Sequence, residues 1–510
     1  MGQFTTNVRS RFEMENQKSE SRNIIGCDLC IVGAGISGLN FLYSASQSMS
    51  KKNKIVLVDR NPGVGGMWNE TYPYVRLHQP HPMFTVGNFS WSLDKDRSHL
   101  ATREEVIGHF DECIDRLRDR VTLVEHYNYE YQGHEEVRVD GEIRAEARLN
   151  PTSSDKPKLL VRSPRLIKAF GMRVPKPKSL NLSSKKVVSI SPLELDLLED
   201  KPENTPVYVV GGGKTGIDTV HAVLKRYPDR EVNLINGRGT LFWNRNKIFP
   251  DGAKRWFGGE LATPALLDYA LRFNGTNEEE VYEYLKSKET LSLTDNCENF
   301  FSGILSEEEK TYILENVNDV IEGYLTEVVD VADRPVMKFR SGAEKTVEPG
   351  SFIIGCTGFL LRKNHAYEPY VSETGTTVSI QSRSSVYLYQ NFTGYWLGQL
   401  LSEGNLMDIP LYTLDNDQLF AKNKKLFTFA WMTQLIYNTI LITDAVPARA
   451  MKECGLNFDN WYPLYRQLPF LLKLKMKKRS YLMHFRKSLD RVCERTQVRG
   501  GPLHVIPDPM

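Results

Sequence analysis

The sequence has almost no net charge and few cysteines. Lys and Arg number 65 against 63 Asp and Glu, so the formal net charge is only +2. Such a balance gives no global reason to expect a nucleic-acid partner. The seven cysteines among 510 residues are an odd, scattered set without a disulfide framework. This usage indicates a reducing, cytoplasmic setting.

Long apolar runs are also missing. No stretch of about 18 residues is uninterruptedly apolar, which argues against a transmembrane helix. The first 23 residues are polar and lack an apolar core, so we expect no secretory signal and a disordered tail over residues 1–24. We identify no metal site. The remaining length is enough for two or three domains with large cores.

A complete dinucleotide-binding pattern lies near the start of the chain. An apolar strand is expected over residues 28–33, followed by a glycine turn, a helix and a second strand over 54–59 that ends in Asp59. The glycines permit a tight turn, close approach to a pyrophosphate and helix packing, and the acid accepts from ribose hydroxyls. The helix N-terminus attracts phosphate. The turn residues expected to bind cofactor are Gly33, Gly35, Ser37 and Gly38.

A second pattern of the same kind begins at residue 206. Its second strand, over 231–236, ends in neutral Asn236, and Arg238 follows two residues later. Loss of the acid and gain of an arginine favour a 2′-phosphate, and therefore NADPH over NADH. A lysine in the turn adds a point charge for the phosphates. The residues expected to bind NADPH are Gly211, Gly213, Lys214, Thr215, Gly216, Asn236 and Arg238.

The turn Gly65-Gly66-Met67-Trp68 follows Asp59 closely and resembles the flavin-containing and Baeyer–Villiger monooxygenases. The resemblance implies FAD as a cofactor, with this turn near the ring system and residues 72–82 along the flavin face. Residues 352–359 resemble the strand by which that family returns to its FAD domain. The resemblance implies cofactor contacts for Arg60, Gly66, Met67, Trp68, Arg76, His78, Gln79, Thr357 and Gly358.

The chain also departs from that family. His78 replaces an Asp of the flavin-face stretch, and Tyr74 replaces a Gly. The fingerprint Phe-x-Gly-x-x-x-His is absent, because the aligned residues 183–189 keep none of its three fixed positions. These departures weaken any Baeyer–Villiger assignment.

The expected fold class is α/β, with two Rossmann-like dinucleotide-binding domains for FAD and NADPH, the second inserted in the first. A helical C-terminal region follows. The expected boundaries are 25–171 and 351–410 for the FAD domain, 172–350 for the NADPH domain with a helical insertion over 252–335, and 411–510 for the C-terminal region.

The resemblance implies a single-component oxygenase in which NADPH reduces FAD, O₂ adds at the flavin C4a, and the hydroperoxide oxidises a small aromatic or phenolic substrate. One alternative is a flavin-dependent halogenase that uses halide on a phenol or indole and needs a lysine near the pocket. A disulfide or quinone reductase is disfavoured, because no redox cysteine pair follows the first turn. The oligomeric state stays open. The catalytic candidates are Arg76, His78, Gln79 and, for the halogenase, Lys247, with Lys254 as a second lysine.

Two segments of the last hundred residues have two interpretations each. Residues 426–436 are apolar and residues 473–479 are rich in lysine. The first interpretation is a helix packed over the FAD domain. The second is a patch that contacts a membrane surface.

Overall fold

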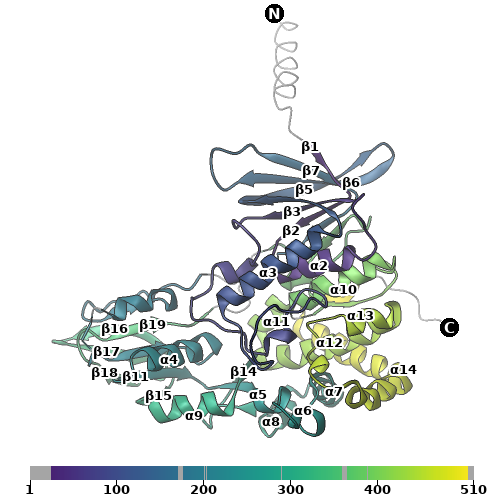
Figure 1. Cartoon of the computed structure of the whole chain (residues 1–510). Helices are drawn as coiled ribbons and strands as arrows, with labels where there is room; N and C mark the ends of the chain where they lie inside the picture. Colours follow the sequence, from purple (N-terminus) through teal and green to yellow (C-terminus); the bar gives the residue numbers. More distant parts are fainter. Residues whose placement is uncertain are drawn as a thin grey trace, which may run out of the picture.

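Two parallel sheets of five strands organise the chain (Figure 1). The computed structural model describes residues 24–170, 176–199, 201–202, 204–288, 290–358, 365–387 and 389–503. The expected tail over residues 1–24 lies outside this part of the chain except for Ile24, and the expected domain boundary at residue 171 lies outside it as well.

The first sheet has the strand order β4-β3-β2-β8-β20, and all its neighbours are parallel. A four-stranded sheet, β1-β7-β6-β5, packs beside it and shares an apolar core with it. The elements of this first unit are β1 Ile24–Gly26, β2 Leu29–Val32, α2 Ile36–Ala45, β3 Lys54–Asp59, η1 Gly66–Asn69, η2 His81–Met83, α3 Arg103–Arg118, β4 Thr122–Tyr127, β5 Tyr129–Val139, β6 Glu142–Pro151, β7 Leu159–Ser163, β8 Leu166–Lys168, β20 Thr377–Ser379, η4 Ser382–Ser384 and α10 Gln390–Ser402.

The second sheet repeats the plan in the order β15-β11-β10-β19-β9, again with parallel neighbours. Its elements and the strands and helices attached to it are β9 Val188–Ile190, η3 Pro192–Leu198, β10 Val207–Val210, α4 Lys214–Arg226, β11 Val232–Gly237, β12 Thr240–Asn244, α5 Arg245–Ile248, α6 Lys254–Phe257, α7 Ala262–Arg272, α8 Glu278–Lys286, β13 Thr290–Leu291, β14 Asn299–Leu305, α9 Glu307–Asn316, β15 Asp319–Glu322, β16 Leu325–Val331, β17 Arg334–Phe339, β18 Glu344–Thr346 and β19 Phe352–Gly355.

The strands predicted at both glycine patterns are confirmed, because each is a run of apolar residues buried on both faces of a parallel sheet. Two expectations need correction: where the FAD domain resumes, and the structure of residues 252–335. Strand β19 pairs with β10, so residues 352–355 belong to the second sheet rather than to the returning FAD domain. The first unit resumes with β20 and with α10, which packs on α2.

The insertion over residues 252–335 is only partly helical. Helices α6, α7 and α8 lie in its first half and α9 in its second, but β14, β15 and β16 lie in the second half as well. Strand β15 completes the edge of the second sheet beside β11. The helical interpretation failed because short strands in this region carry polar residues on their exposed faces and lack a continuous apolar run.

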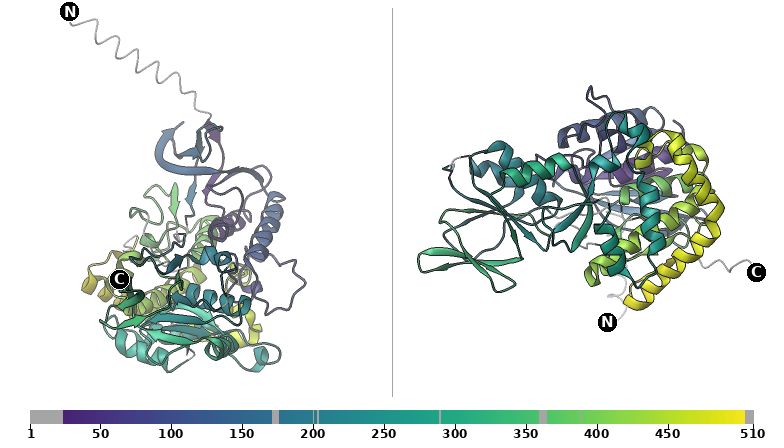
Figure 2. Two further views of the ribbon diagram at one scale, coloured as in Figure 1. Left: turned by 90° about the vertical axis from the view of Figure 1, so that its left-hand side faces the viewer. Right: turned by 90° about the horizontal axis from the view of Figure 1, so that it is seen from below.

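The C-terminal region is mainly helical, as predicted, and lies at the end of the molecule opposite strands β16, β17 and β18 of the second unit (Figures 1 and 2). Helix α12 is long and apolar enough to cross a membrane, but 78% of its apolar window is buried, so it is a core helix. The elements are β21 Tyr412–Leu414, α11 Asn416–Lys422, α12 Lys424–Ala445, α13 Ala448–Lys452, η5 Phe458–Trp461, α14 Leu464–Thr496 and β22 Gly500–Pro502.

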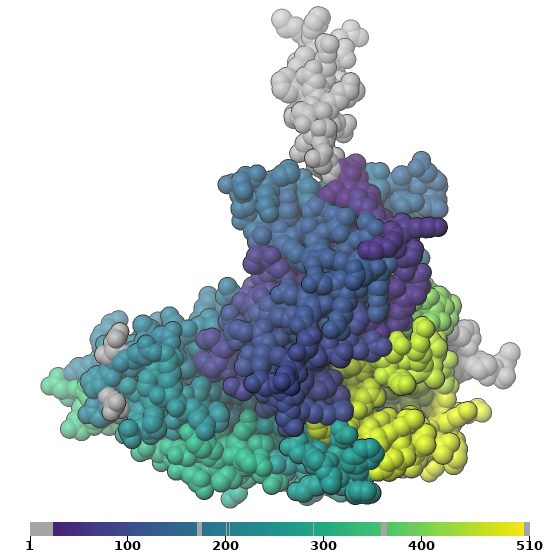
Figure 3. Space-filling view, in the orientation of Figure 1, coloured from purple at the N-terminus to yellow at the C-terminus, as the bar shows by residue number. Residues whose placement is uncertain are grey.

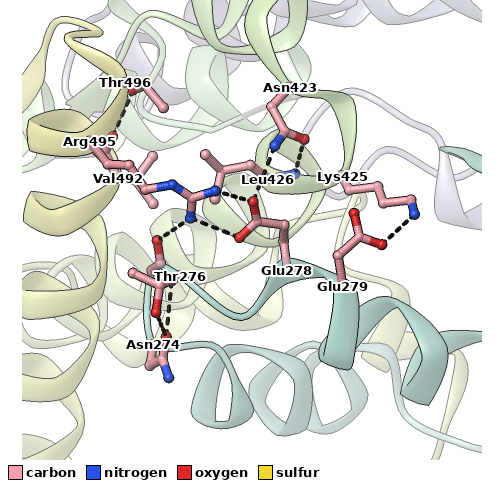
Figure 4. A network of polar contacts seen from close by, with 11 residues as sticks. Asn274, Thr276, Glu278, Glu279, Asn423, Lys425, Leu426, Val492, Arg495 and Thr496 are labelled. Atoms are coloured by element: carbon pink, nitrogen blue, oxygen red, sulfur yellow. Dashed lines mark hydrogen bonds and ion pairs between the residues drawn. The ribbon is translucent and has the colours of Figure 1, made fainter.

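An ion pair with a buried carboxylate joins this region to the second unit (Figure 4). Arg495 of α14 donates to Oε2 of Glu278 on α8 at 2.9 Å, and Asn423 donates to Oε1 at 3.1 Å. Burial would raise the pKa of the Glu278 carboxyl, but Arg495 outweighs it and holds the pKa below its usual range. The contact fixes α8 against α12 and α14, and the space-filling view has these segments in contact at the lower right (Figure 3).

Candidate functional site

A cavity of about 1430 Å³ lies between the two parallel sheets and is lined by both glycine turns. This volume exceeds the roughly 300–1,000 Å³ typical of a site for one small ligand. Its walls also include the loop after Trp68, the ends of β8 and β19, and apolar side chains of the C-terminal region. The cavity therefore brings together two nucleotide-binding patterns that lie more than 170 residues apart in sequence.

The first glycine turn has no room for side chains. Gly33 has a φ of +115°, and a Cβ there would lie 2.3 Å from the carbonyl oxygen of Ala169. A Cβ at Gly38 would lie 1.8 Å from the carbonyl oxygen of Gly33. Helix α2 starts directly after Gly35, and no side chain caps its N-terminus. Its first N–H groups are thereby presented to an anion in the cavity.

Asp59 stands at the end of β3 and faces this turn. Its Oδ2 accepts from the Ala34 N–H at 2.6 Å, and its Oδ1 accepts from the Asn61 N–H at 2.8 Å. The side chain is buried, and burial raises the pKa of its carboxyl. These bonds fix the carboxylate while each oxygen keeps a further acceptor position for a ribose hydroxyl.

The loop with two adjacent glycines packs directly on the first turn. A Cβ at Gly66 would lie 2.8 Å from Cα of Gly35, so the two backbones are in contact. Trp68 is buried against Phe84, with ring centroids 5.8 Å apart. Arg60 forms an ion pair with Glu70 at 2.9 Å. The residues of this segment that line the cavity are Asp59, Arg60, Gly65, Gly66, Met67 and Trp68, together with Ser37 of α2.

The second glycine turn repeats this geometry. Gly211 has a φ of +127°, and a Cβ there would lie 2.7 Å from the carbonyl oxygen of Cys356. A Cβ at Gly216 would lie 1.7 Å from the carbonyl oxygen of Gly211. Helix α4 begins after Gly213, again without a side-chain cap. Thr215 lines the cavity with this turn, and Thr357 and Gly358 line it after β19.

Asn236 and Arg238, the residues predicted to select a 2′-phosphate, lie at the end of β11 and directly after it. Asn236 is buried, and its Nδ2 donates to Thr294 Oγ1 at 3.1 Å. Arg238 is exposed and forms an ion pair with Glu298 at 2.6 Å. The guanidinium carbon lies 6.0 Å from the ring centroid of Tyr324, which lines the cavity. Arg238 itself lies at the rim rather than in the wall.

The loop from Tyr72 bridges the two units. The Tyr72 hydroxyl donates to Asp218 Oδ2 at 2.8 Å, and Asp218 Oδ1 accepts from Lys214 at 2.5 Å. The hydroxyls of Tyr74 and Thr219 lie 2.9 Å apart. The loop is thus held against α4, and the lysine of the second turn is fixed by its neighbour one helical turn later.

Arg76, His78 and Gln79 all line the cavity. Arg245 donates to the carbonyl oxygen of His78 at 2.8 Å and forms an ion pair with Glu309 at 2.9 Å. Burial and the positive charges of Lys214 and Arg245 lower the pKa of His78 to about 3. Its imidazole is therefore neutral at pH 7, when it can donate or accept a hydrogen bond but holds no extra proton.

The lowered pKa of His78 predicts an acid-sensitive fold. An unfolded histidine binds a proton below about pH 6.5, whereas folded His78 stays neutral down to about pH 3. Its contribution to stability is complete above pH 6.5 and is lost as the pH falls. We expect His78→Gln to reduce, by about 1–2 kcal/mol, the loss of unfolding free energy between pH 7.5 and pH 5. Chemical denaturation at both pH values measures this; an unchanged loss contradicts it.

Several sequence candidates lie elsewhere. Lys247 and Lys254 are exposed, and neither is among the described residues of the cavity wall. His81 is buried outside the wall, with its Nδ1 3.1 Å from the carbonyl oxygen of His99. The segment where the monooxygenase fingerprint is missing is tied to β16, since Ser183 N–H donates to Glu327 at 2.9 Å.

One buried pair in the wall has no counterpart in the sequence predictions. Lys168, at the end of β8, donates to both carboxylate oxygens of Glu368, at 2.5 and 2.6 Å. Both residues line the cavity, and Lys168 is buried. A lysine that ends an apolar strand was the only signal in the sequence, because its partner lies 200 residues away.

The wall also contains an apolar section from the second unit and the C-terminal region. These side chains can enclose an apolar substrate and exclude water. They are Trp243, Ile248, Leu261, Leu266, Trp431, Leu435 and Phe458, joined by Met83 of η2 from the first unit.

Residues 31–88 match a protein family described as the NAD(P)-binding Rossmann-like domain. This range contains the first glycine turn, Asp59 and the Gly-Gly-x-Trp loop. The chain contains a Rossmann-like domain. The parallel strand order of the first sheet agrees with that family, and the second sheet repeats it.

Curated relatives include uncharacterized proteins of Mycobacterium bovis and Mycobacterium tuberculosis. The match is 27% identical over 209 residues and covers 38% of this chain. The chain spans about a third, 35%, of the length of these relatives.

Similar solved structures include a monooxygenase, a hydroxylase and a disulfide reductase. A cyclohexanone monooxygenase is 13% identical, with 88% of this chain and 98% of that chain covered and a TM-score of 0.47. The ornithine hydroxylase of Pseudomonas aeruginosa (11%, 75% and 99%, 0.45) and the bacillithiol disulfide reductase of Staphylococcus aureus (11%, 75% and 99%, 0.44) follow. At these values the likeness assigns neither reaction nor substrate to this chain.

Proposed function

We propose that the protein is a single-component oxygenase that uses FAD and NADPH to oxidise a small apolar or aromatic substrate with O₂. The observation that carries the proposal is the pair of glycine turns of equal geometry that open into the same cavity. Two dinucleotides in one cavity place a nicotinamide within reach of a flavin. Bound FAD would supply hydride acceptance and oxygen activation.

The residues at each turn fit the two cofactors. The N-terminus of α2 and Asp59 would hold the pyrophosphate and ribose of FAD, with Gly66 and Trp68 beside it. At the second turn, a Cβ on Gly213 meets nothing within 4 Å, so the backbone there is open to a ligand. Because residue 236 is Asn, no carboxylate of that residue would repel a 2′-phosphate on the ribose of NADPH, and Arg238 lies two residues away to bind that phosphate.

The chain's own residues would position and enclose the substrate and the cofactors, and few of them would transfer protons. Arg76 and Gln79 offer donors to the cavity, and neutral His78 adds one hydrogen bond. The hydrogen bond from Tyr72 to Asp218 of α4 holds the loop that contains Tyr72 against this helix. The apolar section of the wall would keep water from the reacting atoms.

A thiol reductase receives no support from the cysteines. All seven are free thiols, and Cys356, the one in the cavity wall, is buried so that its pKa is raised to about 12. Such a thiol is a poor nucleophile at neutral pH. The halogenase alternative rests on Lys247, which lies outside the wall, and no further observation favours it.

The reaction test is isotopic. Purified holoenzyme would be incubated with NADPH, ¹⁸O₂ and a panel of phenols and other small aromatics, with and without bromide or chloride. We expect one ¹⁸O atom per product molecule, independent of halide. Halogenated product would contradict oxygenation, and NADPH oxidation that yields only hydrogen peroxide with every compound would count against the substrate class.

Coenzyme preference tests the role of Arg238. Binding a 2′-phosphate requires Arg238 to exchange Glu298 for the phosphate, a charge-assisted contact. We expect Arg238→Ala to lower the NADPH/NADH ratio of kcat/KM roughly ten-fold or more. The matched variant Glu298→Gln, which removes the competing carboxylate, should raise that ratio. An unchanged ratio in Arg238→Ala refutes the role.

A further inference from the structure

Helix α14 carries apolar side chains on two faces, one buried and one exposed. Its inward face is buried against α12 and α7 through Leu474, Tyr481, Phe485 and Leu489. Its outward face is also apolar but exposed. These outward side chains, Leu464, Leu468, Leu471, Leu472, Met476 and Met483, follow helical spacing and are 40% to 80% exposed. A helix that needed only to pack on the core would carry polar residues there.

The short helix α6 extends this outward face. Its Phe257 is 88% exposed and its Trp256 is 45% exposed. The Tyr465 hydroxyl of α14 donates to the Trp256 carbonyl oxygen at 2.5 Å, and Arg466 donates to the Gly259 carbonyl oxygen at 3.1 Å. The two helices therefore form one continuous surface, which we call the outer apolar face. In Figure 2, right, α14 runs along the outside edge of the molecule.

Basic residues surround this face. Residues 464–489 contain eight Lys and Arg and no Asp or Glu. Lys473, Lys475, Lys477 and Arg479 are exposed among the outward apolar side chains. Exposed Trp, Phe, Leu and Met ringed by lysine are typical of helices that lie in the interface of an anionic membrane.

The outer apolar face also adjoins the cavity. Residues 260–263, 265 and 266 line the cavity and follow directly on the segment that contacts the start of α14. A partner bound to the outer apolar face would therefore lie beside one wall of the cavity.

We propose that the outer apolar face docks on the surface of anionic phospholipid membranes, with α14 and α6 in the interfacial layer and the chain not spanning it. The apolar side chains enter the boundary between headgroups and acyl chains, and the lysines pair with lipid phosphates and carboxylates. A second copy of the chain is a poorer occupant, because joining two such faces brings two lysine-rich stretches together without compensating acids.

Vesicle co-sedimentation of the full chain tests this proposal. The probes are vesicles of phosphatidylcholine and of phosphatidylcholine with phosphatidylserine. We expect binding to the anionic vesicles that weakens with salt, and little binding to the neutral ones. Lys473→Gln, Lys475→Gln and Lys477→Gln together should weaken the partition coefficient roughly a hundred-fold. Leu472→Glu with Met476→Glu should abolish binding.

The control is Leu314→Glu, which places one such negative charge at an exposed apolar position of α9, away from this face, and should bind like wild type. All variants change exposed positions, so their thermal midpoints should match wild type. Absence of wild-type binding to anionic vesicles overturns the proposal, as does equal binding by the Leu472/Met476 variant. A wild-type dimer in light scattering that this variant dissociates also overturns it, since the face would then join two copies.

Discussion

A Gly213→Val protein is expected to fold, to keep its yellow flavin and to lose its affinity for NADPH. A Cβ at this position meets nothing within 4 Å, so the added side chain projects into open cavity. It would occupy the space where the backbone must approach a pyrophosphate. We expect the KM for NADPH to rise at least about a hundred-fold, or about 2.7 kcal/mol.

Steady-state NADPH oxidation and the flavin absorbance of the same sample measure this effect. Gly108→Ala on α3 is the control, because a Cβ there also meets nothing within 4 Å and the position is outside the cavity wall. It should leave both readings at the wild-type level. An unchanged KM in Gly213→Val would remove the second turn from the NADPH site.

Substitution of valine for Gly35, the equivalent glycine of the first turn, should instead remove the flavin. Gly35→Val is expected to give colourless protein, because a Cβ there already lies 3.2 Å from Cα of Gly66 and the valine methyl groups fill the remaining approach to the turn. Loss of a cofactor bound only by the folded chain should also lower the thermal midpoint.

Flavin released by denaturation, measured per chain, gives the occupancy, and circular dichroism shows whether the variant is folded. Gly213→Val is the matched control for bulk and should retain flavin. Full FAD occupancy in folded Gly35→Val would contradict the assignment of the first turn.

Local sequence patterns were enough for both nucleotide-binding units. The strands and the glycine turns were predictable because buried parallel strands are short apolar runs and the turns need residues without a Cβ. The resemblance to the monooxygenases implied that Arg76, His78 and Gln79 contact the flavin, and all three line the cavity.

Features that depend on distant contacts were not predictable. Lys168 is paired with Glu368, 200 residues away, and β19 joined the second sheet because β10 and β9 offered it parallel neighbours. The lysine Lys247 was chosen by residue type alone, and the fold turns it to solvent. The low pKa of His78 depends first on its burial and then on the positive charges of Lys214 and Arg245, and only the fold supplies both.

An anaerobic titration of the purified protein with NADPH tests the central claim, that one cavity holds FAD and NADPH together. The account predicts a yellow protein with one FAD per chain whose flavin absorbance is bleached by one equivalent of NADPH and returns when O₂ is admitted. Protein purified without flavin, or flavin that stays oxidised in the presence of saturating NADPH, would contradict it.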